Sequence, residues 1–319
     1  MADAGLFVHK SARDAHEQIT RLWDFMSPTI VAMWNLRWQV QGFLKVKPDA
    51  TQDELKQRFA LGSEIRGNEI KRACVDNSWD EQKNRFASIL LTNSIAIFEE
   101  FLDGLVGLNL SGEKKTKTVK ALQFPVQGGG RNYLQGYTAM GSTVPELVGA
   151  FSSGAALGKW YSKAKLQNLL LCYRVFKEIR NASVHAGGRA TPEVMAAHAE
   201  FLPVATASAL GVKEAPKYPA PMLNQVMTVD YRGVSMFSDV ILRLIATYDR
   251  DFSDRRGALD DISNRLGKVP SLWRGRTVNA KKKQKIVDGL MHNAGMPVPN
   301  YTQGFMTWLK QTDRMPAGW

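Results

Sequence analysis

The chain has 319 residues, of which 44% are hydrophobic, so it is long enough for one large or two smaller domains with a sizeable core. Its formal net charge of +12 favours a polyanionic partner, either nucleic acid or an acidic membrane surface. No uninterrupted apolar run approaches the length that spans a bilayer, so we expect no membrane partner.

Two further features narrow the class of protein. Residues 1–10 lack the basic and apolar regions of a secretory signal. Cys74 and Cys172 form neither a CxxC pair nor a metal-like cluster, which favours a reducing compartment. We therefore expect a cytoplasmic protein without a metal or a cofactor.

The positive charge is concentrated in two segments. Residues 111–190 carry 12 lysines and arginines against 3 acids, a net charge of +9, and residues 249–319 carry 13 against 7, a net charge of +6. The segments 1–110 and 191–248 have net charges of −2 and −1. The most basic segment fits a phosphate-backbone substrate, and lysines on solvated helix faces are the alternative explanation.

The spacing of apolar residues predicts a helix over residues 11–46, which Pro28 should kink or split. Trp23, Trp34 and Trp38 share one stripe of this helix. Packing in a core or a dimer is the favoured role for these rings, and stacking on bases is the alternative.

A capping box predicts the next helix. Thr51 and Glu54 stand three residues apart, as a reciprocal cap requires, at the start of a helix over residues 51–60. Residues 61–74 are polar, and we expect them to continue as helix.

Residues 78–108 predict a strong helix with a buried apolar stripe. Glu99 and Glu100 fall near that stripe, next to side chains that are expected to be buried. One of them could hold an arginine from another helix, and a surface glutamate beside the core is the equal alternative.

Residues 109–152 lack regularly spaced apolar residues, which predicts a basic loop insertion over this range. We expect one short helix within it, near residues 145–149. The glycines at 128–130 are followed by no Gly-Lys-Ser/Thr, which argues against a phosphate-binding P-loop. Tyr133 could stack on a base. Contacts with RNA phosphates are expected from the basic side chains of the insertion: Lys114, Lys115, Lys117 and Arg131.

The chain is organised around a helix over residues 165–185. Leu169, Cys172, Phe176 and Ile179 recur on one apolar stripe of it. The glycines at 187 and 188 predict its end, because glycine adopts the left-handed conformation that terminates helices. The polar residues that precede them therefore lie in the last turns of a half-buried helix.

Three polar side chains in these last turns suit attack on a phosphodiester without a metal. The imidazole of His185 can take or give a proton near neutral pH. The guanidinium of Arg180 matches phosphate oxygens, and the amide of Asn181 can orient a ring nitrogen or a substrate oxygen. The ribose 2′-OH of RNA supplies the nucleophile.

The hexapeptide Arg180-Asn181-Ala182-Ser183-Val184-His185 resembles the R-x4-6-H motif of the HEPN superfamily. The glutamate-bearing stretch at residues 96–105 resembles an early helix of several HEPN families. The resemblance covers roughly residues 82–250. A helix end at which arginine and histidine meet the helix dipole favourably is the alternative explanation of the motif.

This resemblance implies a helical bundle and, in many members, a metal-independent endoribonuclease that pairs two motifs across a homodimer. It implies catalytic roles for Arg180, Asn181 and His185, with Glu99 holding the arginine. Lys177 and Arg189, which flank the motif, are expected to contact RNA. The products would be a 2′,3′-cyclic phosphate and a 5′-hydroxyl, and many such enzymes are toxins or antiviral defence effectors with an antitoxin or defence-complex partner.

After the motif, Thr191 and Pro192 begin a helix that runs to about residue 202, on which His198 is expected to be partly buried. Residues 203–224 are a proline-rich connection. A helix from Ser235 would complete the bundle.

Residues 251–319 predict a basic C-terminal region with one short helix over 281–293. Trp273, Phe305 and Trp308 are spread among its charges. This mixture fits single-stranded nucleic acid, and a small subdomain packed on the bundle is equally compatible with it.

We therefore predict an all-α protein in three parts: an N-terminal helical extension (1–77), a HEPN-like up-and-down bundle (78–250) and the basic C-terminal region (251–319). The main functional hypothesis is a metal-independent endoribonuclease acting as a homodimer. A non-catalytic HEPN-like module that binds RNA or a protein is the second hypothesis. A basic adaptor that binds DNA is the third.

Overall fold

The computed structural model describes residues 5–64, 69–126, 130–152, 160–267 and 279–314. The described residues are all-α, with isolated β-bridges and no strand, which confirms the all-α part of the prediction. In chain order the helices are α1 (Lys10–Val46), α2 (Gln52–Phe59), the π-helical turn η1 (Arg72–Asp76), α3 (Trp79–Gly107), α4 (Gly112–Ala121), α5 (Tyr133–Ala139), the 3-10 turn η3 (Lys163–Lys165), α6 (Leu166–His185), α7 (Pro192–Phe201), the 3-10 turn η4 (Leu202–Val204), α8 (Ala207–Leu210), α9 (Tyr231–Asp251), α10 (Arg256–Arg265), α11 (Ala280–Asn293) and α12 (Gln303–Gln311).

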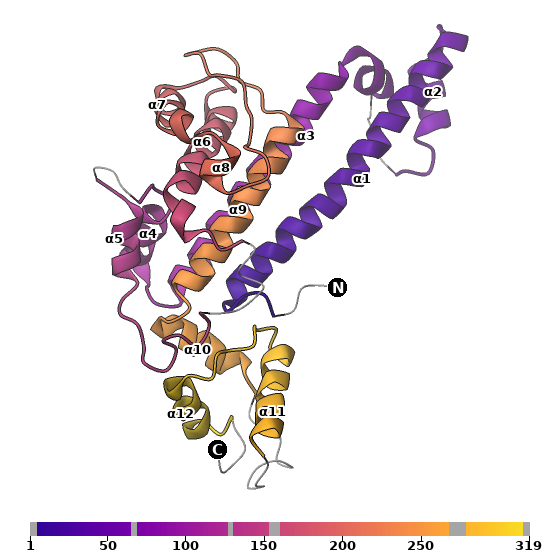
Figure 1. Ribbon diagram of the computed structural model, residues 1–319. Helices are drawn as coiled ribbons and strands as arrows, with labels where there is room; N and C mark the ends of the chain where they lie inside the picture. The colour runs from indigo at the N-terminus through magenta and orange to yellow at the C-terminus, as the bar shows by residue number, and fades with distance from the viewer. Residues whose placement is uncertain (1–4, 65–68, 127–129, 153–159, 268–278, 315–319) are drawn as a thin grey trace.

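The main core lies between the long helices α1, α3, α6 and α9 (Figure 1). Their apolar stripes meet there, and the aromatic rings interlock at the centre. Phe98 of α3 packs edge-on against Tyr173 of α6, and Phe176 of α6 stacks on Phe237 of α9 with ring centroids 4.4 Å apart. Burial of these large rings fixes α6 against its neighbours and leaves its opposite face for polar side chains.

The first long helix extends past the main core (Figure 1). It is not split at Pro28, because the helix continues from Lys10 to Val46 through the proline. Trp23 packs against the main core, as expected. Trp34 and Trp38 are exposed, and Trp34 contacts both Trp38 and Trp79.

A second, smaller core joins the far end of α1 to α2 and η1. Thr51 and Glu54 form the predicted capping box of α2. The expected continuous helix over 61–74 is wrong, because residues 60–63 form turns and Glu69 is not helical, although residues 70–74 are helical; residues 65–68 lie outside the described residues.

The prediction of an irregular loop over 109–152 is also wrong. Charged side chains mask the helical period of α4, whose apolar face is short, and α5 is only seven residues long. The residues at 145–150 form turns and not the expected helix. Tyr133 is buried in the main core, where its hydroxyl donates to the carboxylate of Asp251 at 2.7 Å, so it cannot stack on a base.

The predicted helices α7 and α9 are present, although α9 begins at Tyr231 and not at Ser235, because Asp230 caps it by accepting from the Gly233 amide. His198 is half-buried, as expected, and its Nδ1 is hydrogen-bonded to the Tyr218 hydroxyl.

The C-terminal helices α10, α11 and α12 enclose a core of their own. Phe305 and Trp308 are buried in it, which favours the packed-subdomain alternative over exposed aromatics for nucleic acid. Trp273 lies outside the described residues. Val8, from the N-terminal segment, belongs to this core, while the preceding Phe7 belongs to the main core.

Candidate functional site

The candidate site lies on α6 and is positioned by the buried stripe of that helix. Leu169, Cys172, Phe176 and Ile179 are all buried, as predicted. The helix ends where predicted, because Gly187 and Gly188 adopt φ angles of +60° and +76°. The Gly188 amide donates to the Ala182 carbonyl at 3.0 Å and closes the last turn.

Glu99 of α3 is the central acceptor of the site. One of its carboxylate oxygens accepts from the Arg180 guanidinium at 3.0 Å, and the other accepts from the Lys177 ammonium. Lys177 also donates to the side-chain carbonyl of Gln123, which follows α4. Glu99, not Glu100, therefore reaches the arginine, whereas Glu100 is exposed in a groove between α3 and α1.

The two cations are largely removed from solvent, with 17% of the Lys177 side chain and 19% of the Arg180 side chain exposed. Burial lowers the pKa of Lys177, and its hydrogen bond to Glu99 opposes that shift. The Arg180 Nε is buried and has no hydrogen-bond partner among the described residues. This donor is removed from solvent, so an acceptor could satisfy it only after the arginine side chain moves.

Asn181 and His185 lie on the neighbouring stripe of α6. The Asn181 amide donates to the Glu178 carboxylate at 3.1 Å, and that carboxylate is also paired with Arg174. His185 is exposed in the last turn. Within the described residues, no hydrogen bond joins His185 to Arg180, whose guanidinium donates to Glu99 instead.

The segment after α6 is covered on one side by residues 222–227. Backbone hydrogen bonds join the two segments from Gly188 to Ala190, and the Arg189 guanidinium donates to the Asn224 carbonyl at 2.9 Å. Several apolar side chains of this region are exposed. They are Val184 on α6 and Met222, Leu223 and Val226 on the covering segment.

The basic side chains of residues 109–152 that are predicted to contact RNA lie in two places, apart from Lys177 and Arg189 beside the motif. Three lie on α4, where Lys114 is exposed, Lys115 is paired with Asp103 and Lys117 is paired with Glu113. Arg131 is exposed just before α5 and lines a pocket beside α6.

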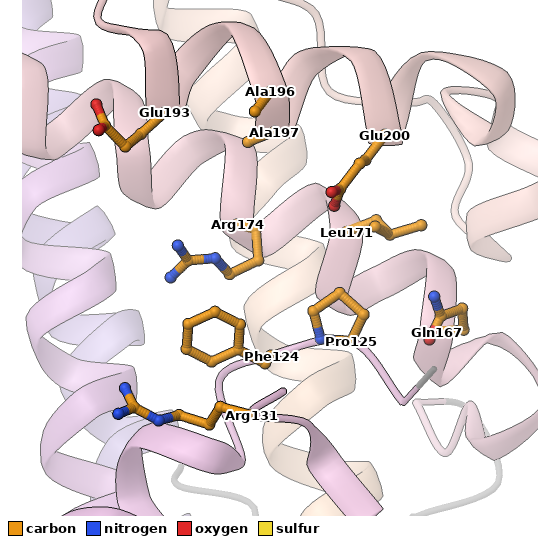
Figure 2. A pocket seen from close by; sticks show the side chains of 10 residues that line it. All are labelled: Phe124, Pro125, Arg131, Gln167, Leu171, Arg174, Glu193, Ala196, Ala197 and Glu200. Atoms are coloured by element: carbon orange, nitrogen blue, oxygen red, sulfur yellow. The ribbon is translucent and has the colours of Figure 1, made fainter. Parts of the chain in front are cut away.

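That pocket has a volume of about 580 Å³ and lies between α6, α7 and the segment after α4 (Figure 2). Sequence reasoning missed it, along with the roles of Gln123, Phe124, Arg174 and Glu178. One signal was present: Arg174, Glu178, Asn181 and His185 recur at helical spacing on one stripe of α6.

Three other features that bear on function are metal-binding clusters, disulfides and membrane-spanning helices. Within the described ranges, no three His, Cys, Asp or Glu side chains are grouped so that they could hold a metal ion, and both cysteines are buried as free thiols. No helix in the part of the chain that the structure describes combines the length and apolarity needed to cross a bilayer.

Comparisons of the chain with protein-family models, with curated proteins and with solved structures gave no match. The assignment of function therefore depends on the residues and geometry of this chain.

Proposed function

We propose that this protein is a metal-independent endoribonuclease of the HEPN type, built on a HEPN-like helical bundle. His185 would exchange the proton of the attacking ribose 2′-OH or of the leaving oxygen. Arg180 would bind the scissile phosphate and stabilise the negative charge that develops in the transition state. Asn181 would orient the histidine or a phosphate oxygen, and the products would be a 2′,3′-cyclic phosphate and a 5′-hydroxyl.

The observation that carries the proposal is that an exposed imidazole and a fixed cation both lie on the last turns of one helix. Arg180 is held by Glu99 but keeps its Nε without a partner among the described residues. Glu99 is thus a positioning residue in this proposal, since it restricts the arginine to one conformation. The surrounding segment, residues 111–190, has the highest net positive charge of the chain.

A homodimer would supply the contact that one chain lacks. On an ideal helix the side chains of Arg180 and His185 point about 140° apart, so they suit opposite sides of a two-fold axis better than one monomeric cleft. The exposed Val184 and Val226 beside the motif support an interface there. Two copies would also bring their positive charges to one RNA site.

Cleavage without a metal tests the enzymatic proposal. Wild-type protein incubated with RNA in EDTA should yield fragments with 2′,3′-cyclic phosphates, and His185→Ala should lower the rate by about 100-fold or more. His292→Ala, at another exposed histidine on α11, is the matched control and should keep the wild-type rate. Cleavage that requires Mg²⁺, or that persists in His185→Ala, contradicts the mechanism.

Mixing two inactive variants tests whether the site is shared. If Arg180 of one chain acts with His185 of the other, a mixture of Arg180→Ala and His185→Ala should regain part of the activity, because mixed dimers contain one intact site. A mixture that stays as inactive as either variant alone argues against a shared site.

The interface has a separate test in the oligomeric state. Val226→Asp should place charges against each other across the two-fold axis and shift the protein toward the monomer in analytical ultracentrifugation. Val298→Asp is the matched control, because Val298 is similarly exposed in the C-terminal region. If Val226→Asp sediments like the wild type, the interface does not include this residue.

A second function, a non-catalytic module that binds RNA or a protein, is favoured by one observation. Arg180 is already ion-paired with Glu99, and among the described residues no hydrogen bond joins it to His185. RNA binding that is retained in His185→Ala, with no cleavage by either protein, would support this alternative. A role as a toxin or antiviral defence effector, with an antitoxin or defence-complex partner, belongs to the enzymatic proposal alone.

A further inference from the structure

The pocket of about 580 Å³ beside α6 combines cationic, aromatic and carboxylate side chains on three elements. Gln167, Leu171 and Arg174 line it from one stripe of α6. The α7 wall presents two exposed carboxylates, Glu193 and Glu200. Its volume lies within the range of small-molecule sites in proteins.

The third wall is formed by Phe124 and Pro125, which follow α4, and by Arg131, which precedes α5. The Arg174 guanidinium lies over the Phe124 ring at 4.3 Å from its centroid, and that of Arg131 lies at 5.8 Å. In Figure 2 the ring lies between the two guanidinium groups. These cation–π contacts hold both guanidinium groups beside the ring.

The charges of the pocket differ in how they are compensated. Arg174 is paired with Glu178, on its own helix. Arg131 is exposed and forms no ion pair with any acid that the structure describes. Arg131 can therefore accept an anion at little cost in broken contacts, and Arg174 can add donors from across the Phe124 ring.

We propose that this pocket binds one nucleotide. Its phosphate would lie on Arg131 and Arg174, whose N–H groups match phosphate oxygens. Its base would stack against a guanidinium plane or Pro125 and donate its exocyclic amino group to Glu200 or Glu193. Adenine, guanine and cytosine carry such an amino group, and uracil does not.

A nucleotide can reach this pocket in two ways, and both use the same chemistry. The first rests on the proposed function: the nucleotide is part of an RNA strand that is cut at His185. Arg174 and His185 are eleven residues apart on one stripe of α6, which is about 16 Å along the axis, so a strand of a few nucleotides spans them. The second source is a free mononucleotide.

Calorimetric titration of the full chain with AMP, GMP, CMP and UMP tests the pocket itself. The nucleotides with an amino group should bind about ten-fold more tightly than UMP. Arg131→Ala should weaken all four by about ten-fold, and Glu200→Gln should reduce the preference over UMP. The matched controls, Arg72→Ala and Glu69→Gln, change exposed residues near the far end of α1 and should bind like the wild type.

The source of the nucleotide is decided with a fluorescent single-stranded RNA bound to His185→Ala, which should not cut it. If the strand enters the pocket, Arg131→Ala in that background weakens RNA binding, and AMP competes with the RNA. If RNA neither displaces AMP nor responds to Arg131→Ala, the pocket is a site for free nucleotides.

The proposal of nucleotide binding and the proposal of nuclease activity can be refuted independently of each other. Nucleotide binding by a protein that cuts no RNA leaves the pocket proposal standing, and cleavage without nucleotide binding overturns it. Binding that is unchanged in both Arg131→Ala and Glu200→Gln, with circular dichroism showing folded proteins, also overturns it.

Discussion

Glu99 serves two cations of α6 at once, and this sharing determines the charge state of the candidate site. Lys177 and Arg180 are one turn apart and both donate to the same half-buried carboxylate. The cluster therefore keeps a net positive charge, which suits an approaching phosphate. Burial of these charges makes the protonation of Lys177 part of the stability of the fold.

The pH dependence of stability should reveal Lys177. Burial lowers its pKa in the folded protein below the ordinary value of 10.5. The unfolded chain then holds this proton more tightly than the folded chain, so the free energy of unfolding should rise as the pH increases through the lowered pKa toward 10.5. Lys177→Met should lack this rise in urea unfolding measured from about pH 8 upward.

The control for this measurement is Lys310→Met, at an exposed lysine of α12. Its stability should follow the wild type at every pH. A free-energy difference between wild type and Lys177→Met that stays constant with pH would mean that the folded chain does not perturb this lysine.

Among the elements, α9 holds the N-terminal segment in place through one buried carboxylate. Asp249 is fully buried and accepts from the backbone amides of Val8 and His9 at 2.9 and 2.8 Å. The His9 Nδ1 contacts the same carboxylate at 2.8 Å. The amide of Lys10, at the start of α1, donates to Asp261 of α10. This segment thus links the bundle to the C-terminal helices.

Asp249→Ala should lower the free energy of unfolding by at least about 3 kcal/mol, because it leaves several buried groups without their acceptor. Urea unfolding measures the loss, and faster tryptic cleavage at Lys10 should accompany it. Asp260→Ala removes an exposed carboxylate paired with Arg256, and should cost less than about 1 kcal/mol. Similar losses for the two variants would refute the role given to Asp249.

At the scale of the whole molecule, the excess positive charge predicts RNA binding that depends on salt. Each phosphate contact with a single strand contributes about 0.7 to the slope of log affinity against log salt concentration. Lys114 is exposed on α4, so Lys114→Ala should reduce this slope by about 0.7 if the lysine contacts RNA.

Lys310→Ala, on the C-terminal α12, is the control and should leave the slope unchanged. Fluorescence anisotropy at several salt concentrations gives the slopes. An equal reduction for both variants would indicate a diffuse field of charge and no defined path for RNA over α4.

Several helices could be predicted because their signals are local. Hydrophobic periodicity located α1, α3, α6 and α11, and the caps at Thr51 and Thr191 located helix starts to within a residue. The glycine pair located the end of α6. The sequence did not predict the helices α4, α5, α10 and α12. Their segments are short or highly charged, so their apolar residues show too little periodicity to distinguish a helix from a loop.

The sequence by itself therefore determined that the chain is helical and that Arg180, Asn181 and His185 share the end of a half-buried helix. Only the tertiary structure decided that Glu99 reaches Arg180, that Tyr133 is buried and that Phe124 joins two arginines in a pocket. The physical reason is the sequence separation of the interacting residues. A helix forms from contacts between residues within about one turn, whereas these contacts join residues far apart in the chain. Which of them form is decided by how the apolar stripes pack.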